Sequence, residues 1–196
     1  SSSAASDVYK RQDVHNVAAV REALGDDASL YVDANGSLNF DDALRLLHEL
    51  APYRIDGAEQ PLAHWDLDGA AALAARSPVA LLLDESIGST HDLFGATQRR
   101  AATGVQTKTA KNGGAWHIRQ LWTLASAAGW RIRPGNHPST SLATLSVAHL
   151  ATAWGGPLLE GPFAGGIDGE LAGDVVTQPV RLQGNRLALD LSLIHI

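Results

Sequence analysis

The stretch PVALLLDES, at Pro78–Ser86, joins a short apolar run to two consecutive acidic residues. The five apolar residues Val79–Leu83 predict a β-strand that is buried on both faces, as the strands of parallel sheets are. Parallel strands need long crossover connections, usually helices, so this run favours an α/β fold. Asp84 then stands at the carboxyl end of the strand, the end at which barrel enzymes carry their active sites.

The segments on both sides of this strand repeat the alternation of an apolar run and a helical pattern. Upstream, SLYV at Ser29–Val32 leads to Asp33, and Ile55–Ala58 leads to Glu59. Downstream, GVQT leads to Lys108. The helical patterns end near Gly or Pro, which commonly terminate helices. We count about six βα units where a closed barrel has eight, so we expect an incomplete (β/α)8 TIM-type barrel of parallel strands.

The two ends of the chain are related through the genetic code. DVYKRQ at Asp7–Gln12 and LSLIHI at Leu191–Ile196 can be encoded by one DNA string, GATGTGTATAAGAGACAG, and its reverse complement. The string resembles the transposon end of sequencing-library adaptors, and the preceding adaptor bases would encode SSAAS, as found at Ser2–Ser6. We therefore expect adaptor-like, non-native tails at 1–12 and 191–196, and one partial barrel domain at 13–190.

The composition is that of an ordinary globular domain, with 45% hydrophobic and 18% charged residues. The net charge of −6 and the scarcity of clustered Lys and Arg argue against nucleic acids and anionic membranes as partners, because both are bound through basic clusters. The sequence contains no cysteine, which excludes disulfides and thiolate zinc sites. No apolar run approaches the ~20 residues of a membrane-spanning helix. We expect a cytoplasmic domain that acts on a small molecule.

Four acid or base residues each follow an inferred strand at intervals of roughly 25 residues, the length of one βα unit. They are Asp33, Glu59, Asp84 and Lys108. Singly they are weak signals, because Asp-Ala-Asn could form a turn and Asp-Glu-Ser a helix N-cap. Together they indicate a site, since strand ends in a barrel converge on one mouth. Oxygen ligands without His or Cys suit Mg²⁺ or Mn²⁺ rather than zinc.

These residues lie in motifs that resemble the enolase superfamily, and within it the muconate cycloisomerase-like group of the mandelate racemase and muconate lactonizing enzyme family. The resemblance rests on AVREALG at Ala19–Gly25, VDANG at Val32–Gly36, EQPL at Glu59–Leu62, DES at Asp84–Ser86 and KTAKNGG at Lys108–Gly114. It implies that this is the C-terminal barrel domain, with Asp33, Glu59 and Asp84 as the metal ligands. It also implies that Lys108 is a general acid/base on one face of the substrate.

The implied reaction explains these residue types. Enzymes of this superfamily remove the proton next to a carboxylate, so a metal ion must hold the growing enolate charge. A Lys near that ion loses its proton more easily than in water, because a cation and partial burial disfavour its charged form. For Lys108 the alternative is a solvated lysine at a strand end. Glu85 is expected to face away from the metal, because successive strand side chains point in opposite directions.

The loop GNHPSTS follows the strand at Trp130–Arg133, precedes a helix through Leu145–Ala153, and contains His137. In the racemase branch that resembles mandelate racemase, a His after this strand is a second base, paired with an Asp three residues before the Lys. Here that position is Val105. We therefore name His137 as a candidate catalytic residue, with substrate contact or loop structure as the alternatives.

Two classes of reaction stay open from the sequence. The first is a cycloisomerase, racemase or epimerase acting on a small carboxylate substrate, and the second is an acid-sugar or hydroxy-acid dehydratase. The family's other catalytic Lys-x-Lys pair and its capping domain have no counterpart here, so we expect the fragment itself to be inactive. A non-catalytic scaffold is the remaining alternative. The full-length parent is expected to be a homo-oligomer. Lys111 and Asn112 are expected to shape a turn, and His48 and His149 to lie at the surface or the core edge.

Overall fold

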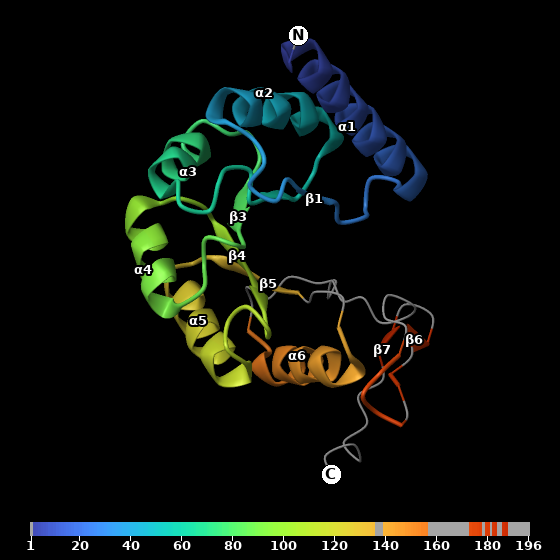
Figure 1. The fold of residues 1–196 in the computed structure, drawn as a ribbon, viewed down its shortest axis with the longest axis vertical. Helices are drawn as coiled ribbons and strands as arrows, with labels where there is room; N and C mark the ends of the chain where they lie inside the picture. The colour runs from blue at the N-terminus through green and yellow to red at the C-terminus, as the bar shows by residue number, and fades with distance from the viewer. Residues whose placement is uncertain are drawn as a thin grey trace. The chain divides into compact units, whose positions relative to one another are not determined.

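The computed structural model describes residues 2–135, 139–156, 173–177, 179–180, 182–183 and 186–187. Along this part of the chain helices alternate with short strands, as the labels of Figure 1 show. The elements are α1 (Ser2–Leu24), β1 (Tyr31–Asp33), α2 (Phe40–Leu50), the 3₁₀ helix η1 (Ala51–Tyr53), β2 (Gly57–Glu59), α3 (Leu67–Ala74), β3 (Leu81–Leu83), α4 (Thr90–Arg99), β4 (Gly104–Lys108), α5 (Ala115–Ala127), β5 (Arg131–Gly135), α6 (Ser141–Trp154), β6 (Leu182–Gln183) and β7 (Arg186–Leu187).

The main sheet has five strands in the order β1-β2-β3-β4-β5, so strands that follow one another in sequence are neighbours. The pairs β1–β2 and β2–β3 are parallel. The prediction of an incomplete (β/α)8 barrel is confirmed, with five strands among the described residues. The sixth unit was expected after Leu158, and residues 157–172 lie outside the described part of the chain. A small antiparallel pair, β6 with β7, was not expected.

Helix α1 begins at Ser2 and continues without a break to Leu24. It therefore runs through the segment 1–12 that the DNA-level pattern sets apart as a tail. The assignment of that segment as non-native stays a prediction, because a backbone conformation does not reveal where a peptide originates. None of the described helices is long and apolar enough to cross a membrane.

The first of two compact units comprises Ser1–Ser86 and Gly95–Gly104. In it α2 contacts both α1 and α3. The buried residues of α2 are Ala43, Leu47 and Leu50, whose spacing places them on one face of the helix. All three residues of β3 are buried as well, which confirms the expected strand covered on both faces.

Arg21 anchors the end of α1 to the first unit. Its buried guanidinium donates hydrogen bonds to the backbone carbonyls of Gly25, Ala28, Tyr53 and Arg54, at 2.7–3.0 Å. Gly25 adopts the expected C-cap conformation, with φ 75° and its N–H bonded to the Arg21 carbonyl at 3.0 Å. These carbonyls lie at the end of η1 and in the loops that lead into β1 and β2, so Arg21 ties α1 to the segments that precede those strands.

The second unit comprises Ile87–Phe94 and Val105–Ile196. Its core includes Trp122 of α5, whose ring is fully buried and whose Nε1 donates to the Thr107 hydroxyl of β4 at 2.9 Å. The Trp154 ring of α6 meets Trp122 edge-on, with centroids 5.8 Å apart. This arrangement joins α5, α6 and β4 around one aromatic pair.

Helix α6 begins at Ser141, the last residue of the loop GNHPSTS that was expected to precede it. Asp174 caps it from 33 residues away, because its carboxylate accepts hydrogen bonds from the Ser141 N–H at 2.9 Å and from the Ser141 hydroxyl. These bonds, the hydroxyl first, hold the pKa of Asp174 below its usual value. The Ser141 hydroxyl oxygen in turn accepts from the Val180 N–H at 2.8 Å.

Candidate metal site

Three carboxylates stand at the ends of three successive strands of the first unit. Asp33 ends β1, Glu59 ends β2, and the two are Cα partners in the parallel register. Glu59 is also the partner of Leu82 in β3, and Asp84 lies two residues beyond Leu82. Partner residues of parallel strands point the same way, and so do residues two apart along a strand. The register therefore assigns all three carboxylates to one face of the sheet.

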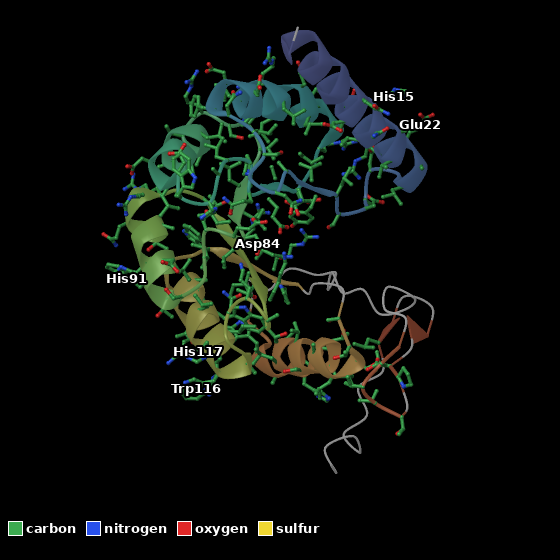
Figure 2. The ribbon with its side chains drawn as sticks, in the orientation of Figure 1. His15, Glu22, Asp84, His91, Trp116 and His117 are labelled. Carbon is green, nitrogen blue, oxygen red and sulfur yellow. The ribbon has the colours of Figure 1, made fainter. Side chains whose placement is uncertain are left out.

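The three carboxylates differ in exposure. Glu59 and Asp84 are 3% and 1% exposed, whereas Asp33 is exposed. Burial disfavours a carboxylate charge unless hydrogen bonds or a cation compensate for it. Asp33 Oδ1 accepts a hydrogen bond from the Asn35 N–H at 2.9 Å, so Asp-Ala-Asn does form a turn at the end of β1. Figure 2 shows Asp84 at the end of β3, while His15 and Glu22 project into solvent from α1.

Sharing a face does not bring the three carboxylates into a cluster. Within the ranges that the structure describes, no group of three or more His, Cys, Asp or Glu side chains is close enough to hold a metal ion. The donor chemistry fits a hard cation, since all three candidates offer carboxylate oxygens. The assignment of Asp33, Glu59 and Asp84 as ligands thus stays a prediction, supported by their register.

Gln60, the residue after Glu59, was not singled out by the sequence. It is 1% exposed and has φ 37°, a left-handed conformation that is uncommon for a residue other than glycine. Its Oε1 accepts hydrogen bonds from the N–H groups of Asp84 and Ser86, at 3.0 and 3.1 Å. Its Nε2 donates to the Leu62 carbonyl and to the Ser86 hydroxyl oxygen, both at 2.8 Å. The side chain therefore bridges the ends of β2 and β3.

Lys108 is the last residue of β4, in the second unit, and is half-buried. Its N–H donates to Asn112 Oδ1 at 2.9 Å, and Asn112 Nδ2 donates to the Ile87 carbonyl at 2.9 Å. Lys111 Nζ donates to the Gln106 carbonyl at 3.0 Å. Asn112 and Lys111 thus shape the turn after β4, as the sequence indicated. The catalytic role of Lys108 stays a prediction.

The other expectations for polar residues vary in outcome. Glu85 is exposed beside the buried Asp84, which agrees with the two side chains facing opposite ways. His48 is exposed and His149 half-buried, as expected. His137 lies outside the described residues, so its candidate role stays a prediction.

A cavity of about 370 Å³ opens beside Asp33. Its walls come from three elements of the first unit and include Asp13 and Asn16 of α1, Val32 and Asp33 of β1, and Leu46 and Leu50 of α2. Asp13 and Asn16 could not be recognised as cavity residues from the sequence, because their approach to β1 depends on how α1 packs. Asp33, one of the three candidate ligands, lines this cavity together with Asp13, so its wall is acidic.

Known proteins match this chain over most of its length. The model of the family described as enolase C-terminal domain-like matches residues 7–191. Muconate cycloisomerase 1 of Pseudomonas putida is 36% identical over 157 residues, which are 76% of this chain and 42% of that protein. N-succinyl-L-Arg/Lys racemase of Bacillus cereus is 31% identical over 142 residues, 72% of this chain and 38% of that protein.

A solved structure shows the same architecture. It is the dipeptide epimerase of Enterococcus faecalis in complex with Mg and the dipeptide L-Leu-L-Tyr. The match covers 88% of this chain and 48% of the epimerase chain, with a TM-score of 0.77 and 26% identity. The relatives include an arabinonate dehydratase of Saccharolobus solfataricus besides cycloisomerases, racemases and epimerases. The chain spans 38–42% of the length of these curated relatives.

Proposed function

The chain belongs to the enolase C-terminal domain-like family, and from that premise we propose that its full-length protein is a divalent-metal enzyme that removes the proton next to a substrate carboxylate. The observation that carries this proposal is the placement of Asp33, Glu59 and Asp84 on one face, at the ends of three successive strands. Three oxygen ligands from three strands suit Mg²⁺ or Mn²⁺.

The metal proposal uses both the burial and the register of the carboxylates. Glu59 and Asp84 are buried, where a cation would compensate their charge most strongly, because interactions are less screened there. Asp33 is the register partner of Glu59 and is anchored by its turn. We propose that these three side chains close around the ion when it binds. The ion would supply Lewis-acid stabilisation of the enolate charge.

Lys108 would carry the proton. Its half-buried position at the end of β4 suits a lysine that must lose its charge, because partial burial disfavours the ammonium form. Its backbone is held by Asn112, which limits the positions that its ammonium group can reach. In this role Lys108 takes the proton from the α-carbon of the substrate or returns it, and it does not bind the metal.

The reaction that we favour is cycloisomerisation, racemisation or epimerisation of a small carboxylate. Its support is the 36% identity to a muconate cycloisomerase and the 31% identity to a racemase. Dehydration of an acid sugar or hydroxy acid is the second candidate, supported by the 26% identity to an arabinonate dehydratase. Both begin with the same proton removal, so a Lys on one face of the substrate leaves both open.

The metal assignment can be tested on the 196-residue chain by titrating it with Mn²⁺ and following free Mn²⁺ by electron paramagnetic resonance. Asp33→Asn, Glu59→Gln and Asp84→Asn should each weaken binding, because each removes one charged oxygen ligand of a hard cation. Glu85→Gln is the matched control, since it removes the same charge one residue away on the exposed side. Loss of Mn²⁺ binding in Glu85→Gln, with Asp84→Asn unaffected, would show that the ligand assignment is wrong.

The role of Lys108 can be tested in the full-length protein by deuterium wash-in from heavy water, followed by NMR of the recovered substrate. Suitable substrates are small carboxylates of the kinds named for the relatives, muconolactone and dipeptides among them. Lys108→Ala should leave Mn²⁺ affinity nearly unchanged and stop exchange on the face of the α-carbon that Lys108 serves. Exchange retained on both faces in this variant would contradict the proposal.

A further inference from the structure

We propose that Gln60 is a positioning residue that fixes Asp84 relative to Glu59, an inference that rests on the proposed metal function. The side chain of Gln60 follows Glu59 directly and bonds to the backbone of Asp84, so one residue joins two candidate ligands. Gln60 itself does not bind the metal, because all four hydrogen-bonding positions of its amide are occupied by groups at the ends of the strands.

The hydrogen-bond network determines which end of the Gln60 amide is oxygen. One end faces two N–H donors, those of Asp84 and Ser86, and must therefore be the carbonyl oxygen. The other end faces the Leu62 carbonyl and the Ser86 hydroxyl, whose own proton is donated to the His64 carbonyl at 2.9 Å. Every hydrogen-bonding position of the amide is thus occupied, and the orientation is fixed.

The backbone of Gln60 takes part in the same junction. Its N–H donates to the Leu82 carbonyl of β3 at 2.8 Å, and its carbonyl accepts from the Gly36 N–H of the β1 turn at 2.7 Å. Gln60 holds φ at 37°, a left-handed conformation that is unfavourable for a residue other than glycine. The surroundings therefore impose this conformation, which directs the side chain across to Asp84.

The consequence concerns the separation of the candidate ligands. Asp84 lies one residue beyond the end of β3, and the bond from its N–H to Gln60 Oε1 ties its backbone to the residue that follows Glu59. Loss of this bond removes one constraint on the position of the Asp84 peptide relative to Glu59. A metal ion binds tightly only when its ligands are held at the correct distances, so loss of this clamp should weaken metal affinity.

The test compares variants of the 196-residue chain by Mn²⁺ titration, thermal unfolding and amide hydrogen exchange measured by NMR. Gln60→Met retains the length of the side chain and removes all four of its hydrogen bonds. Gln60→Gly removes the side chain but relieves the positive φ, so it provides a second variant if the first one folds poorly. Arg21→Met is the matched control, because it removes several hydrogen bonds at the amino ends of the strands, away from the carboxylates.

Both Gln60 variants should weaken Mn²⁺ binding by roughly 10- to 100-fold and speed the exchange of the Asp84 and Ser86 amide protons. Arg21→Met should lower the unfolding temperature without changing Mn²⁺ affinity. Wild-type affinity in a folded Gln60→Met or Gln60→Gly chain would overturn the positioning role, and so would equal loss of affinity in Arg21→Met. If the wild-type chain binds no Mn²⁺, or if Asp84→Asn binds as well as wild type, the proposed metal function fails and this inference fails with it.

Discussion

Replacing Asn112 by Ala should destabilise the second unit by an amount that follows from two hydrogen bonds. Asn112 is 2% exposed, accepts from the Lys108 N–H and donates to the Ile87 carbonyl, each at 2.9 Å, and its longer contact with the Gly88 carbonyl, at 3.4 Å, adds little. Alanine leaves both backbone groups without this partner. An orphaned buried polar group is unfavourable by roughly 1–3 kcal/mol, and two of them should lower the free energy of unfolding by about 2–4 kcal/mol once some hydration is allowed.

The assay is urea unfolding followed by tryptophan fluorescence and circular dichroism. Asn112→Asp is the informative companion, because it retains the acceptor for Lys108 and turns a carboxylate oxygen toward the carbonyls of Ile87 and Gly88. That contact should raise the folded-state pKa of the new carboxyl, since only the protonated form can donate. The bond that the protonated carboxyl donates therefore stabilises the Asn112→Asp variant at a pH below the pKa of this carboxyl in the unfolded chain. This stabilisation is lost as the pH rises through the pKa of the carboxyl in the folded chain.

Two results would refute this reasoning. One is a loss in Asn112→Ala of less than about 1 kcal/mol, which would mean that water replaces both bonds without penalty. The other is an Asn112→Asp chain whose stability does not improve at acidic pH relative to wild type.

Further predictions concern packing, capping and the sheet edge. Gly135→Ala should destabilise the second unit by roughly 1–3 kcal/mol in urea unfolding, because a Cβ there would lie 2.2 Å from Gln106 Nε2 and the buried Gln106 amide has little room to move away. An unchanged midpoint would contradict this. The depressed pKa of Asp174 means that its cap stabilises α6 above the unfolded pKa and loses this effect as the pH falls through the folded pKa. The free energy of unfolding of Asp174→Asn should therefore decrease less than that of the wild type as the pH is lowered. An equal decrease in both chains would exclude this cap as its cause. In the described part of the chain β1 pairs with β2 alone, so we expect a broad, poorly reversible calorimetric transition. A sharp, reversible transition of a monomer would count against this.

The sequence predicted those elements of the fold that a local pattern of apolar residues defines. The run at Val79–Leu83 is continuously apolar, and the structure buries the whole of β3. The pattern indicated a helix through Leu145–Ala153 after the loop GNHPSTS, but it did not indicate what holds the first turn, which begins at Ser141. The missing information was the Asp174 carboxylate, 33 residues away, which caps the first turn. A local pattern does not contain a long-range cap.

In the candidate site, too, local patterns revealed some residues, and contacts between distant parts of the chain determine the role of another. The even spacing of Asp33, Glu59 and Asp84 was visible because each follows an apolar run, and the register then assigned them to one face. Gln60 was passed over because a glutamine beside an acidic residue carries no periodic signal. Its function depends on a left-handed backbone and on partners 24 and 26 residues away, and neither is written in the neighbouring residues.

The bridge between Gln60 and Ser86 has a consequence for how this protein can evolve. Ser86 forms two hydrogen bonds with Gln60, because its N–H donates to Gln60 Oε1 and its hydroxyl oxygen accepts from Gln60 Nε2. The Ser86 hydroxyl also donates a hydrogen bond to the His64 carbonyl. A mutation that removes the Ser86 hydroxyl leaves a buried amide hydrogen of Gln60 without its acceptor, whereas a second mutation at residue 60 removes that defect. The two positions should therefore change together during divergence, with each tolerated substitution at one depending on the residue that is already present at the other.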